Sequence, residues 1–335
     1  MADNGLFALG VGHQSKNNLN ESMDCFFPNP LINLSHEDSE VFSNCSVGTS
    51  EIMPQEAADL NKSTSFDLVP QSLIEIDKPL TLVKLKNDEA IGSVEEAYLK
   101  LHLLSHRLAL PNSLNLTDLF NHLPNVVWTN KGPIDTKEID DQILSHRLEQ
   151  QHLEIFSVDK FPKMTNYVIP SGVRIADASR IRLGAYLGDG TTVMHEGFIN
   201  FNAGAYGPNM VEGRISQGVI IGEGSDLGGS ASTMGTLSGG GEILISIGKN
   251  CLVGANAGTG IPLGDRCTIE AGLYITSGML ISVIDENNKE VNKVKARELA
   301  GNSDMLFIRN SQTGQILCKT NQRAIALNEE LHKNT

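Results

Sequence analysis

The chain has 335 residues, 40% of them hydrophobic, which is enough to bury the core of one large domain or two ordinary ones. It contains no apolar run near the ~18 residues that a membrane-spanning helix needs, and its first twelve residues do not resemble a signal peptide. Its net charge of -14 argues against general binding to nucleic acid or anionic membranes, because phosphates would be repelled unless a local basic patch intervened. We therefore expect a soluble, cytoplasmic protein.

The cysteines and the glycines narrow the class further. The five cysteines are odd in number, widely separated and never form a CxxC pair, which predicts reduced thiols rather than a disulfide framework or a zinc ribbon. The chain has 32 glycines but only 17 aromatic residues. Its core must therefore consist mainly of small and branched residues.

Residues 1–165 have the pattern of an α/β domain. The stretch at about 34–72 is rich in Asn, Ser, Asp and Glu, and we expect it to be poorly ordered. Short apolar runs predict strands at 80–85 and 155–158.

Two helices are predicted in the same domain. An apolar face of helical period runs over residues 93–110, where Ser93 and Glu96 form a capping box and Pro111 ends the helix. A second helical pattern covers residues 136–153, with Asp135 as the predicted N-cap.

Residues 166–284 carry a repeat of six residues. A period of six fits neither a helix nor a long strand, but it suits a very short strand and a turn, and three such units close one triangular coil. Coils would stack at the usual strand spacing of ~4.8 Å, with glycines at the corners. Sixteen aliphatic or β-branched positions predict about five coils: Ile169, Ile175, Ile181, Leu187, Val193, Ile199, Ile215, Ile221, Leu227, Thr233, Ile247, Val253, Leu263, Ile269, Ile275 and Ile281.

Three interruptions break the repeat, at 205–214, after Thr233 and at 259–262. We expect them to be loops that leave the rigid coils, where function is usually placed. The triple glycine at 239–241 is interpreted either as a flexible hairpin or as backbone that a ligand approaches closely. Residues 285–335 are predicted to form a short C-terminal β extension.

Residues 174–216 and 245–279 resemble tetrahydrodipicolinate N-succinyltransferases of the long-chain type found in actinobacteria and some proteobacteria. The resemblance includes RIADASRIRLGAYLGDGTTVMHEGFIN and CTIEAGLYITSGM, and it covers most of the chain after about Tyr98. It implies a mainly β protein with a left-handed parallel β-helix, forming homotrimers whose active sites lie between subunits. The implied reaction moves the succinyl group of succinyl-CoA to the amine of ring-opened tetrahydrodipicolinate, on the diaminopimelate route to lysine. The alternative is a hexapeptide-repeat N- or O-acetyltransferase that uses acetyl-CoA.

Acyl transfer from a thioester to an amine needs a group that accepts the amine proton. The family's catalytic glutamate falls on Glu212, which either forms an acyl anhydride or acts as a general base; the sequence does not separate these roles. His195 is the second candidate, because it is the only histidine within the repeats and other acyltransferases of this fold class use a histidine base. A carbonic anhydrase of the same fold would need three zinc-binding histidines, so we set that class aside.

The resemblance also implies a magnesium ion on the trimer axis, with Glu196 as an acidic ligand. The family's second ligand, an aspartate, aligns with Ser179, and a serine hydroxyl is a poorer ligand for a hard dication than a carboxylate. If the ion binds, we expect it to serve assembly rather than chemistry.

The acyl donor and the acceptor need further residues. Between Lys293 and Arg323 the chain has six basic and two acidic residues, a net charge of +4 that suits the phosphates of coenzyme A. Arg174 and Arg182 are candidates for binding the carboxylates of the dicarboxylate substrate. The donor contacts implied by the resemblance are Arg214, Gly229, Ser232, Ala255, Glu270, Ala271, Gly278, Lys295, Ile308, Arg309, Asn310 and Ser311.

Overall fold

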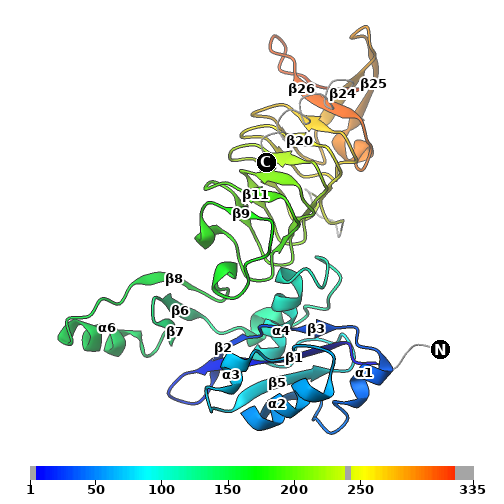
Figure 1. Ribbon diagram of the computed structural model, residues 1–335. Helices are drawn as coiled ribbons and strands as arrows, with labels where there is room; N and C mark the ends of the chain where they lie inside the picture. The colour runs from blue at the N-terminus through cyan, green and yellow to red at the C-terminus, as the bar shows by residue number, and fades with distance from the viewer. Residues whose placement is uncertain (1–4, 238–242, 321–335) are drawn as a thin grey trace. The chain divides into compact units, whose positions relative to one another are not determined.

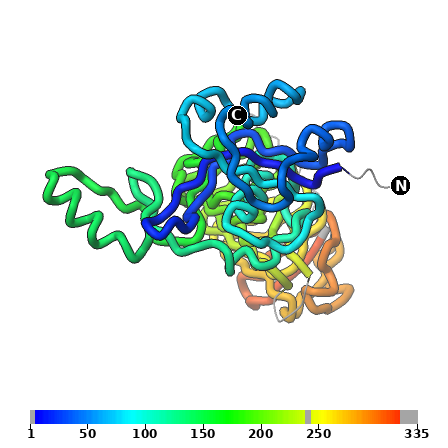
Figure 2. The backbone as a smooth tube through the Cα atoms, turned by 90° about the horizontal axis from the view of Figure 1, so that it is seen from below, coloured from blue at the N-terminus to red at the C-terminus, as the bar shows by residue number. Residues whose placement is uncertain are grey.

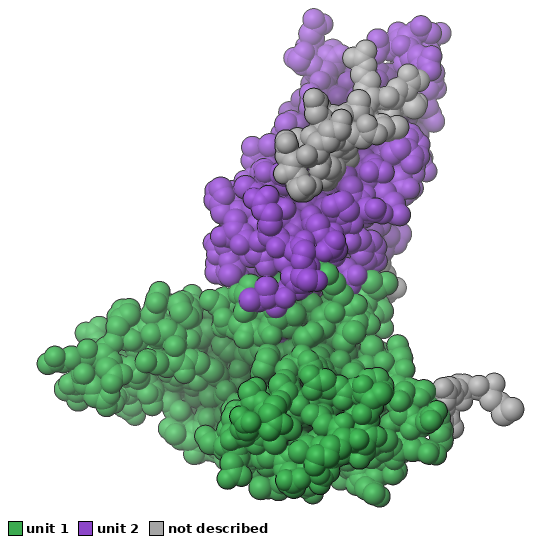
Figure 3. Space-filling model, in the orientation of Figure 1, with its two compact units in different colours: residues 1–168 green, residues 169–335 purple. Residues whose placement is uncertain are grey.

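The computed structural model describes residues 5–237 and 243–320, which fall into two compact units divided between Val168 and Ile169 (Figure 3). Among the described residues, no helix is both long enough and apolar enough to cross a membrane. Each unit has its own core, and the two are described separately.

The first unit is built around a five-stranded sheet in the order β2-β1-β5-β4, with β3 paired to β1 (Figure 1). All its pairings are antiparallel. The strand predicted at 80–85 is β5, and all six of its residues are buried. The strands are β1 Ala8–Lys16, β2 Ser22–Phe26, β3 Leu31–Ile32, β4 Gly48–Ile52 and β5 Leu80–Leu85.

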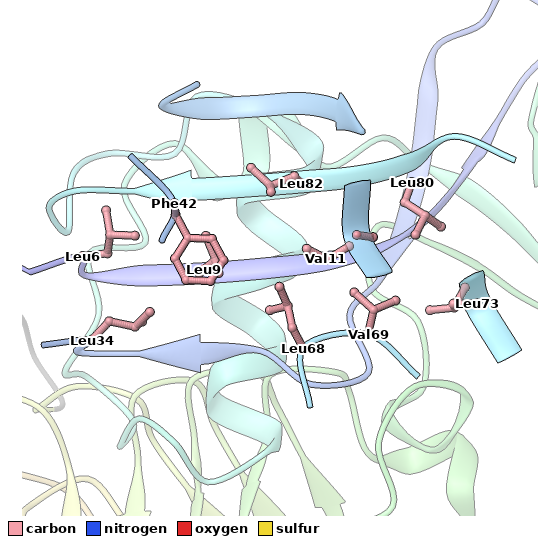
Figure 4. Packing of buried hydrophobic residues seen from close by; sticks show 11 residues of the cluster. Leu6, Leu9, Val11, Leu34, Phe42, Leu68, Val69, Leu73, Leu80 and Leu82 are labelled. Carbon is pink, nitrogen blue, oxygen red and sulfur yellow. The ribbon is translucent and has the colours of Figure 1, made fainter. Parts of the chain in front are cut away.

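The polar stretch 34–72 is ordered, so the expectation of disorder there was wrong. It forms helices α1 (His36–Glu40), α2 (Pro54–Ser63) and α3 (Gln71–Ile74) together with β4. A few apolar residues spaced among the polar ones hold it against the sheet: Phe42, Leu68 and Val69 are fully buried beside Leu9 and Val11 of β1 (Figure 4). These scattered contacts offset the polar composition.

Helix α4 (Val94–Ser105) begins at the predicted N-cap, with the Ser93 side chain accepting a hydrogen bond from Glu96 N, but the predicted capping box is incomplete because the Glu96 carboxylate accepts from Gly92 N rather than Ser93 N. It ends five residues before the predicted Leu110, because Arg107 adopts a left-handed backbone conformation with φ 63°. Burial lowers the pKa of His102 to about 3, so this histidine is a neutral core residue.

A second, three-stranded sheet in the order β7-β6-β8 completes this unit, with helices α5 (Leu119–His122) and α6 (Ile139–Leu148). Its strands are β6 Val126–Thr129, β7 Gly132–Asp135 and β8 Ile155–Asp159, which covers the predicted strand 155–158. The predicted helix 136–153 is shorter at both ends. Asp135 is not its N-cap, because its Oδ1 accepts from Lys137 N at 2.8 Å within a turn before the helix.

The second unit is a left-handed parallel β-helix with three faces (Figures 1 and 2). The four-stranded face contains β10 Tyr186–Leu187, β13 Gly204–Ala205, β16 Ile220–Ile221 and β19 Ser246–Ile247. The five-stranded face contains β12 Phe198–Ile199, β15 Arg214–Ile215, β18 Ser232–Thr233, β21 Gly258–Thr259 and β23 Tyr274–Ile275. The ten-stranded face begins with β9 Arg174–Ile175, β11 Thr191–Val193, β14 Asn209–Val211, β17 Asp226–Leu227, β20 Leu252–Val253 and β22 Thr268–Ile269.

The predicted six-residue positions point into the β-helix. All fourteen from Ile181 onward are buried. Ile169 is 75% exposed and precedes the first coil, so its place in the repeat was a coincidence of spacing. Ile175, on the first strand, is half-buried because only one neighbouring coil covers it.

The three interruptions are not all loops, and this corrects the expectation. A regular coil takes 18 residues, as from Val193 to its partner Val211. The next coil, from Val211 to Leu227, takes 16, so the first interruption is a deletion of two residues in which Ala205 and Val211 keep inward positions. The third interruption is also a two-residue deletion, because Val253 pairs with Ile269.

Only the second interruption extends the chain. The coil from Leu227 to Val253 takes 26 residues, eight more than a regular one. Its described ends approach each other, with Leu237 N donating to Ile243 O at 2.9 Å. The triple glycine 239–241 lies outside the described residues.

A ladder of polar side chains lies inside the corner between the four-stranded and ten-stranded faces. Asn209 Nδ2 donates to Ser225 O at 2.7 Å, and Ser225 Oγ donates to Gly248 O at 2.6 Å. Ser225 Oγ also accepts from Cys251 N at 2.8 Å. The Oγ1 of Thr191, at the start of the ladder, is buried and has no hydrogen-bond partner among the residues that the structure describes.

The C-terminal segment extends the β-helix. Its elements are β24 Leu280–Ile284, β25 Glu290–Lys295, the 3-10 helix η3 Ala296–Leu299, β26 Met305–Arg309 and β27 Ile316–Thr320; shorter 3-10 turns, η1 Met164–Asn166 and η2 Ala178–Arg180, lie earlier. Strand β26 pairs in parallel with β22 and so adds a further rung to the ten-stranded face. Arg266 joins this rung to the preceding one: its Nε donates to Asp304 Oδ1 at 2.6 Å and its Nη2 donates to Asp304 Oδ2 at 2.7 Å.

Candidate active site

Eight of the eighteen predicted site residues lie at one corner of the β-helix. We call it the Glu212 corner: the turns that lead from the ten-stranded face to the five-stranded face, at residues 176–180, 194–197, 212–213, 228–231, 254–257 and 270–273. Parallel pairing between successive coils stacks these turns. The sequence alone could not align them, because the coil lengths differ.

Glu212 occupies the shortened turn of this corner, where the first two-residue deletion falls. Its main chain is fixed by two hydrogen bonds, from Glu212 N to Leu227 O at 2.9 Å and from Ser230 N to Glu212 O at 3.2 Å. A β-carbon added at Gly229 would lie 3.6 Å from Glu212 Oε2, so the open face of this glycine lies beside the carboxylate. The structure thus brings together Glu212, the predicted catalytic acid, and Gly229, a predicted contact of the acyl donor.

His195 and Glu196 lie at the same corner, one coil before Glu212. Both side chains are exposed, by 71% and 60%, and His195 Nε2 lies 3.5 Å from Glu196 Oε1. The turn one coil before Glu212 thus carries an exposed histidine–carboxylate pair.

The residues predicted for magnesium do not form a fitting donor set within one chain. Ser179 Oγ donates to Asp177 Oδ1 at 2.6 Å, and this hydrogen bond, with one from Ser179 N, lowers the pKa of Asp177. The hydroxyl is therefore engaged by a neighbouring carboxylate. Over the part of the chain that the structure describes, no group of three or more His, Cys, Asp or Glu residues could hold a metal ion.

Three small residues continue the corner above Glu212. Asn256 N donates to Gly229 O and Gly272 N donates to Ala255 O, both at 2.8 Å, which stacks Gly229, Ala255 and Ala271 on successive coils. We call these three residues the small-residue track. They leave the backbone of the corner open to close approach by an extended ligand.

The five-stranded face begins where this corner ends. Arg214 pairs with Ser232, and both point outward because their successors Ile215 and Thr233 point in. The same outward row continues through Gly258 and Tyr274. The sequence analysis missed Phe198, Gly258 and Tyr274, although each comes directly before an inward position, which is the signal that could have identified the row.

The two candidate substrate arginines separate in space. The Arg182 guanidinium lies 6.0 Å from the ring centre of Phe198, the residue that pairs with Arg214, and its Nη1 donates to Asn200 Oδ1 at 3.2 Å. Arg174 pairs with Thr192 on the ten-stranded face. Of the two, Arg182 is the one that lies next to the outward row.

Basic residues gather in the C-terminal rungs beyond the track. Arg297 N donates to Ser277 O at 3.0 Å and Ala296 N donates to Met279 O at 2.8 Å, which places Gly278 opposite the segment that contains Lys295. Lys293, Lys295, Arg297 and Arg309 are exposed, whereas Arg323 lies outside the described residues.

Residues 308–311, at the end of β26 and the start of the following turn, are joined to the Glu212 corner. Glu270 Oε2 accepts from Arg309 N at 2.7 Å. Asn310 Oδ1 accepts from Gln312 N and Thr313 N at 2.9 and 3.1 Å, which fixes the turn that contains Ser311. Glu270 thus connects the predicted acyl-donor contacts of the corner with those at residues 308–311.

A β-helix of hexapeptide coils, with a carboxylate beside an open corner and a basic terminus, defines a hexapeptide-repeat acyltransferase. Two family models match the chain: "Hexapeptide repeat of succinyl-transferase" at residues 244–277 and "Tetrahydrodipicolinate N-succinyltransferase middle" at residues 123–163. The 2,3,4,5-tetrahydropyridine-2,6-dicarboxylate N-succinyltransferases of Pseudomonas putida and Vibrio cholerae are 52% and 50% identical to it, over 98% of this chain and 98% and 99% of theirs. The chain belongs to this N-succinyltransferase family.

A solved structure agrees with this assignment. It comes from Campylobacter jejuni and is provisionally described as a 2,3,4,5-tetrahydropyridine-2-carboxylate N-succinyltransferase. It is 32% identical in sequence and superimposes with a TM-score of 0.85, covering 96% of this chain and 94% of that one. The likeness therefore extends over both units.

Proposed function

We propose that succinyl transfer takes place at the Glu212 corner, with Glu212 as the general base. As a member of its family, the chain transfers a succinyl group to tetrahydrodipicolinate, a step toward diaminopimelate and lysine, and a succinyltransferase takes this group from succinyl-CoA. The observation that carries the placement is the Glu212 carboxylate beside the open face of Gly229, at the foot of the small-residue track.

In the proposed reaction the neutral amine of the ring-opened substrate attacks the thioester carbonyl carbon. A carbon–nitrogen bond forms and the carbon–sulfur bond breaks, while Glu212 accepts the amine proton and then returns it to the departing CoA thiolate. An anhydride between Glu212 and the succinyl group is the alternative. A single turnover without acceptor separates the two, because only the anhydride releases one CoA per active site.

Tests of the function compare donors and variants. We expect free CoA to be released faster from succinyl-CoA than from acetyl-CoA in the presence of tetrahydrodipicolinate. Glu212→Gln is expected to lower kcat by roughly 10²- to 10⁴-fold, the usual contribution of a positioned base. Glu223→Gln is the matched control, because Glu223 is an exposed glutamate paired with Lys249 on a different turn. Preference for acetyl-CoA, or normal activity of the Glu212→Gln variant, would contradict the proposal.

We further propose that the protein is a cytoplasmic homotrimer with each site completed by a neighbouring subunit. The five free cysteines are compatible with a reducing compartment, and hexapeptide β-helices of this family commonly form trimers. Light scattering should give about three times the chain mass of 36.2 kDa. A mass of one chain would refute the trimer. No step is assigned to magnesium, because the described residues of one chain form no fitting donor set.

A further inference from the structure

Tyr274 lies across the outer surface of its neighbouring strand. It is the first residue of β23, and its partner on β21 is Gly258. A β-carbon added at Gly258 would lie only 2.3 Å from Cε2 and 2.6 Å from Cδ2 of the Tyr274 ring. The ring therefore rests directly on Gly258, which is buried beneath it, while Tyr274 itself remains half-buried. Gly258 allows this arrangement because any side chain would displace the ring.

This ring stands in the outward row that contains two predicted donor contacts. Ser232 pairs with Gly258, and Arg214 pairs with Ser232, so Tyr274 is two strands from Ser232 and three from Arg214. At the usual strand spacing these separations are ~10 and ~14 Å. The row runs parallel to the small-residue track, since each strand of the five-stranded face follows its own turn of the Glu212 corner.

The same strand leads to the basic end of the molecule. Ser277 lies three residues after Tyr274, and its carbonyl accepts from Arg297 N, which belongs to the predicted phosphate-binding segment that begins at Lys293. A ligand that extends from Glu212 to this segment along the five-stranded face would pass the ring. Within the outward row the other aromatic residue is Phe198, which lies below Arg214 and has the Arg182 guanidinium over its ring.

We propose that Tyr274 binds the acyl donor. Its ring forms an apolar wall beside the small-residue track, and the pantetheine arm of coenzyme A packs against this wall. This inference rests on the proposed function. An aromatic ring supplies a large, rigid apolar surface at little cost in conformational entropy. The pantetheine arm is a chain of methylene groups and amides, so it can pack methylenes on the ring while its amides bond to the backbone of the corner.

The test is the affinity of free CoA measured by titration calorimetry, with the full-length protein. Tyr274→Ala is expected to weaken CoA binding about tenfold, a factor that corresponds to about 1.4 kcal/mol. Tyr274→Phe keeps the ring and should bind within about threefold of wild type. In steady-state assays Tyr274→Ala should raise the KM for succinyl-CoA while leaving kcat and the KM for the acceptor close to wild type.

Tyr186→Ala is the matched control. Tyr186 is also a half-buried first residue of a β-helix strand beside a glycine, Gly204, but it lies on the four-stranded face. It should leave CoA affinity unchanged. Tyr274→Thr, which suits a strand better than alanine, repeats the test if the alanine variant is poorly folded.

The outcomes separate this inference from the proposed function. Wild-type affinity in a folded Tyr274→Ala or Tyr274→Thr variant overturns the role of Tyr274 alone, and so does an equal loss in Tyr186→Ala. Failure of the wild-type protein to bind CoA overturns the proposed function itself.

Discussion

Substitution by alanine should have different effects at two adjacent glycines of the Glu212 corner. At Gly228 it should reduce stability, and at Gly229 it should reduce activity. At Gly228 an added β-carbon would lie 2.6 Å from the backbone nitrogen of Ala255, so the coils must shift apart. At Gly229 the nearest atom would be Glu212 Oε2 at 3.6 Å, an ordinary van der Waals contact. Overpacking against backbone costs about 1–3 kcal/mol, whereas a substitution into free space stays within about 0.5 kcal/mol.

We therefore expect Gly228→Ala to lower the free energy of unfolding by about 1–3 kcal/mol, and Gly229→Ala to leave it nearly unchanged. Activity, in contrast, should be lost in Gly229→Ala. The methyl group at Gly229 would occupy the open space beside the carboxylate and displace the thioester, and misplacement by about 1 Å costs about 100-fold in rate. Denaturant unfolding and CoA-release assays on both variants provide the comparison.

The reasoning is refuted if Gly229→Ala is fully active, because the space beside Glu212 would then be irrelevant to the reaction. It is equally refuted if Gly229→Ala unfolds more readily than Gly228→Ala, because the backbone contacts of the corner would then be wrong.

Three further substitutions test the β-helix itself. Thr191→Val removes a buried hydroxyl that has no partner within the described part of the chain and should raise the melting temperature, whereas a lower value would show that the hydroxyl is hydrogen-bonded. Ser225→Ala leaves the buried Cys251 N unpaired and removes the donor to the half-buried Gly248 O, so it should cost about 1–3 kcal/mol in urea unfolding; a cost below about 0.5 kcal/mol would contradict the ladder. Arg266 holds the pKa of Asp304 below its usual value, so its contribution is present above about pH 4 and is lost as the pH falls through the lowered pKa. Arg266→Gln should therefore lower the melting temperature at pH 7, and this loss should shrink as the pH falls below about 4; a loss that does not change with pH would refute the ion pair.

The sequence predicted the kind of fold well, because the six-residue period records directly which side chains point inward. Ile181, Leu187 and Val193, six residues apart, are buried on the three successive faces of one coil. The six-residue period did not identify the inward positions where the residue type and the spacing changed together. Ala205 was passed over because alanine is a weak hydrophobic signal, and a deletion of two residues a few positions later reset the phase, so a continuous coil was interpreted as a loop.

The sequence named candidate residues for the site but could not give their arrangement. Glu212, Gly229 and Ala255 are separated by 17 and 26 residues along the chain, and the unequal coil lengths hide the fact that they belong to one corner. The Tyr274 ring over Gly258 was invisible for a related reason. Its orientation depends on the neighbouring strand's lack of a side chain, and strand pairing is known only from the structure.

The most direct test of the account is a crystal structure of the protein with coenzyme A bound. We expect the CoA sulfur beside Glu212 and Gly229, the pantetheine arm along the small-residue track, and the phosphates at the segment that contains Lys295 and Arg309. Coenzyme A bound at another corner of the β-helix, or with its sulfur remote from Glu212, would contradict the assignment of the Glu212 corner as the site of succinyl transfer.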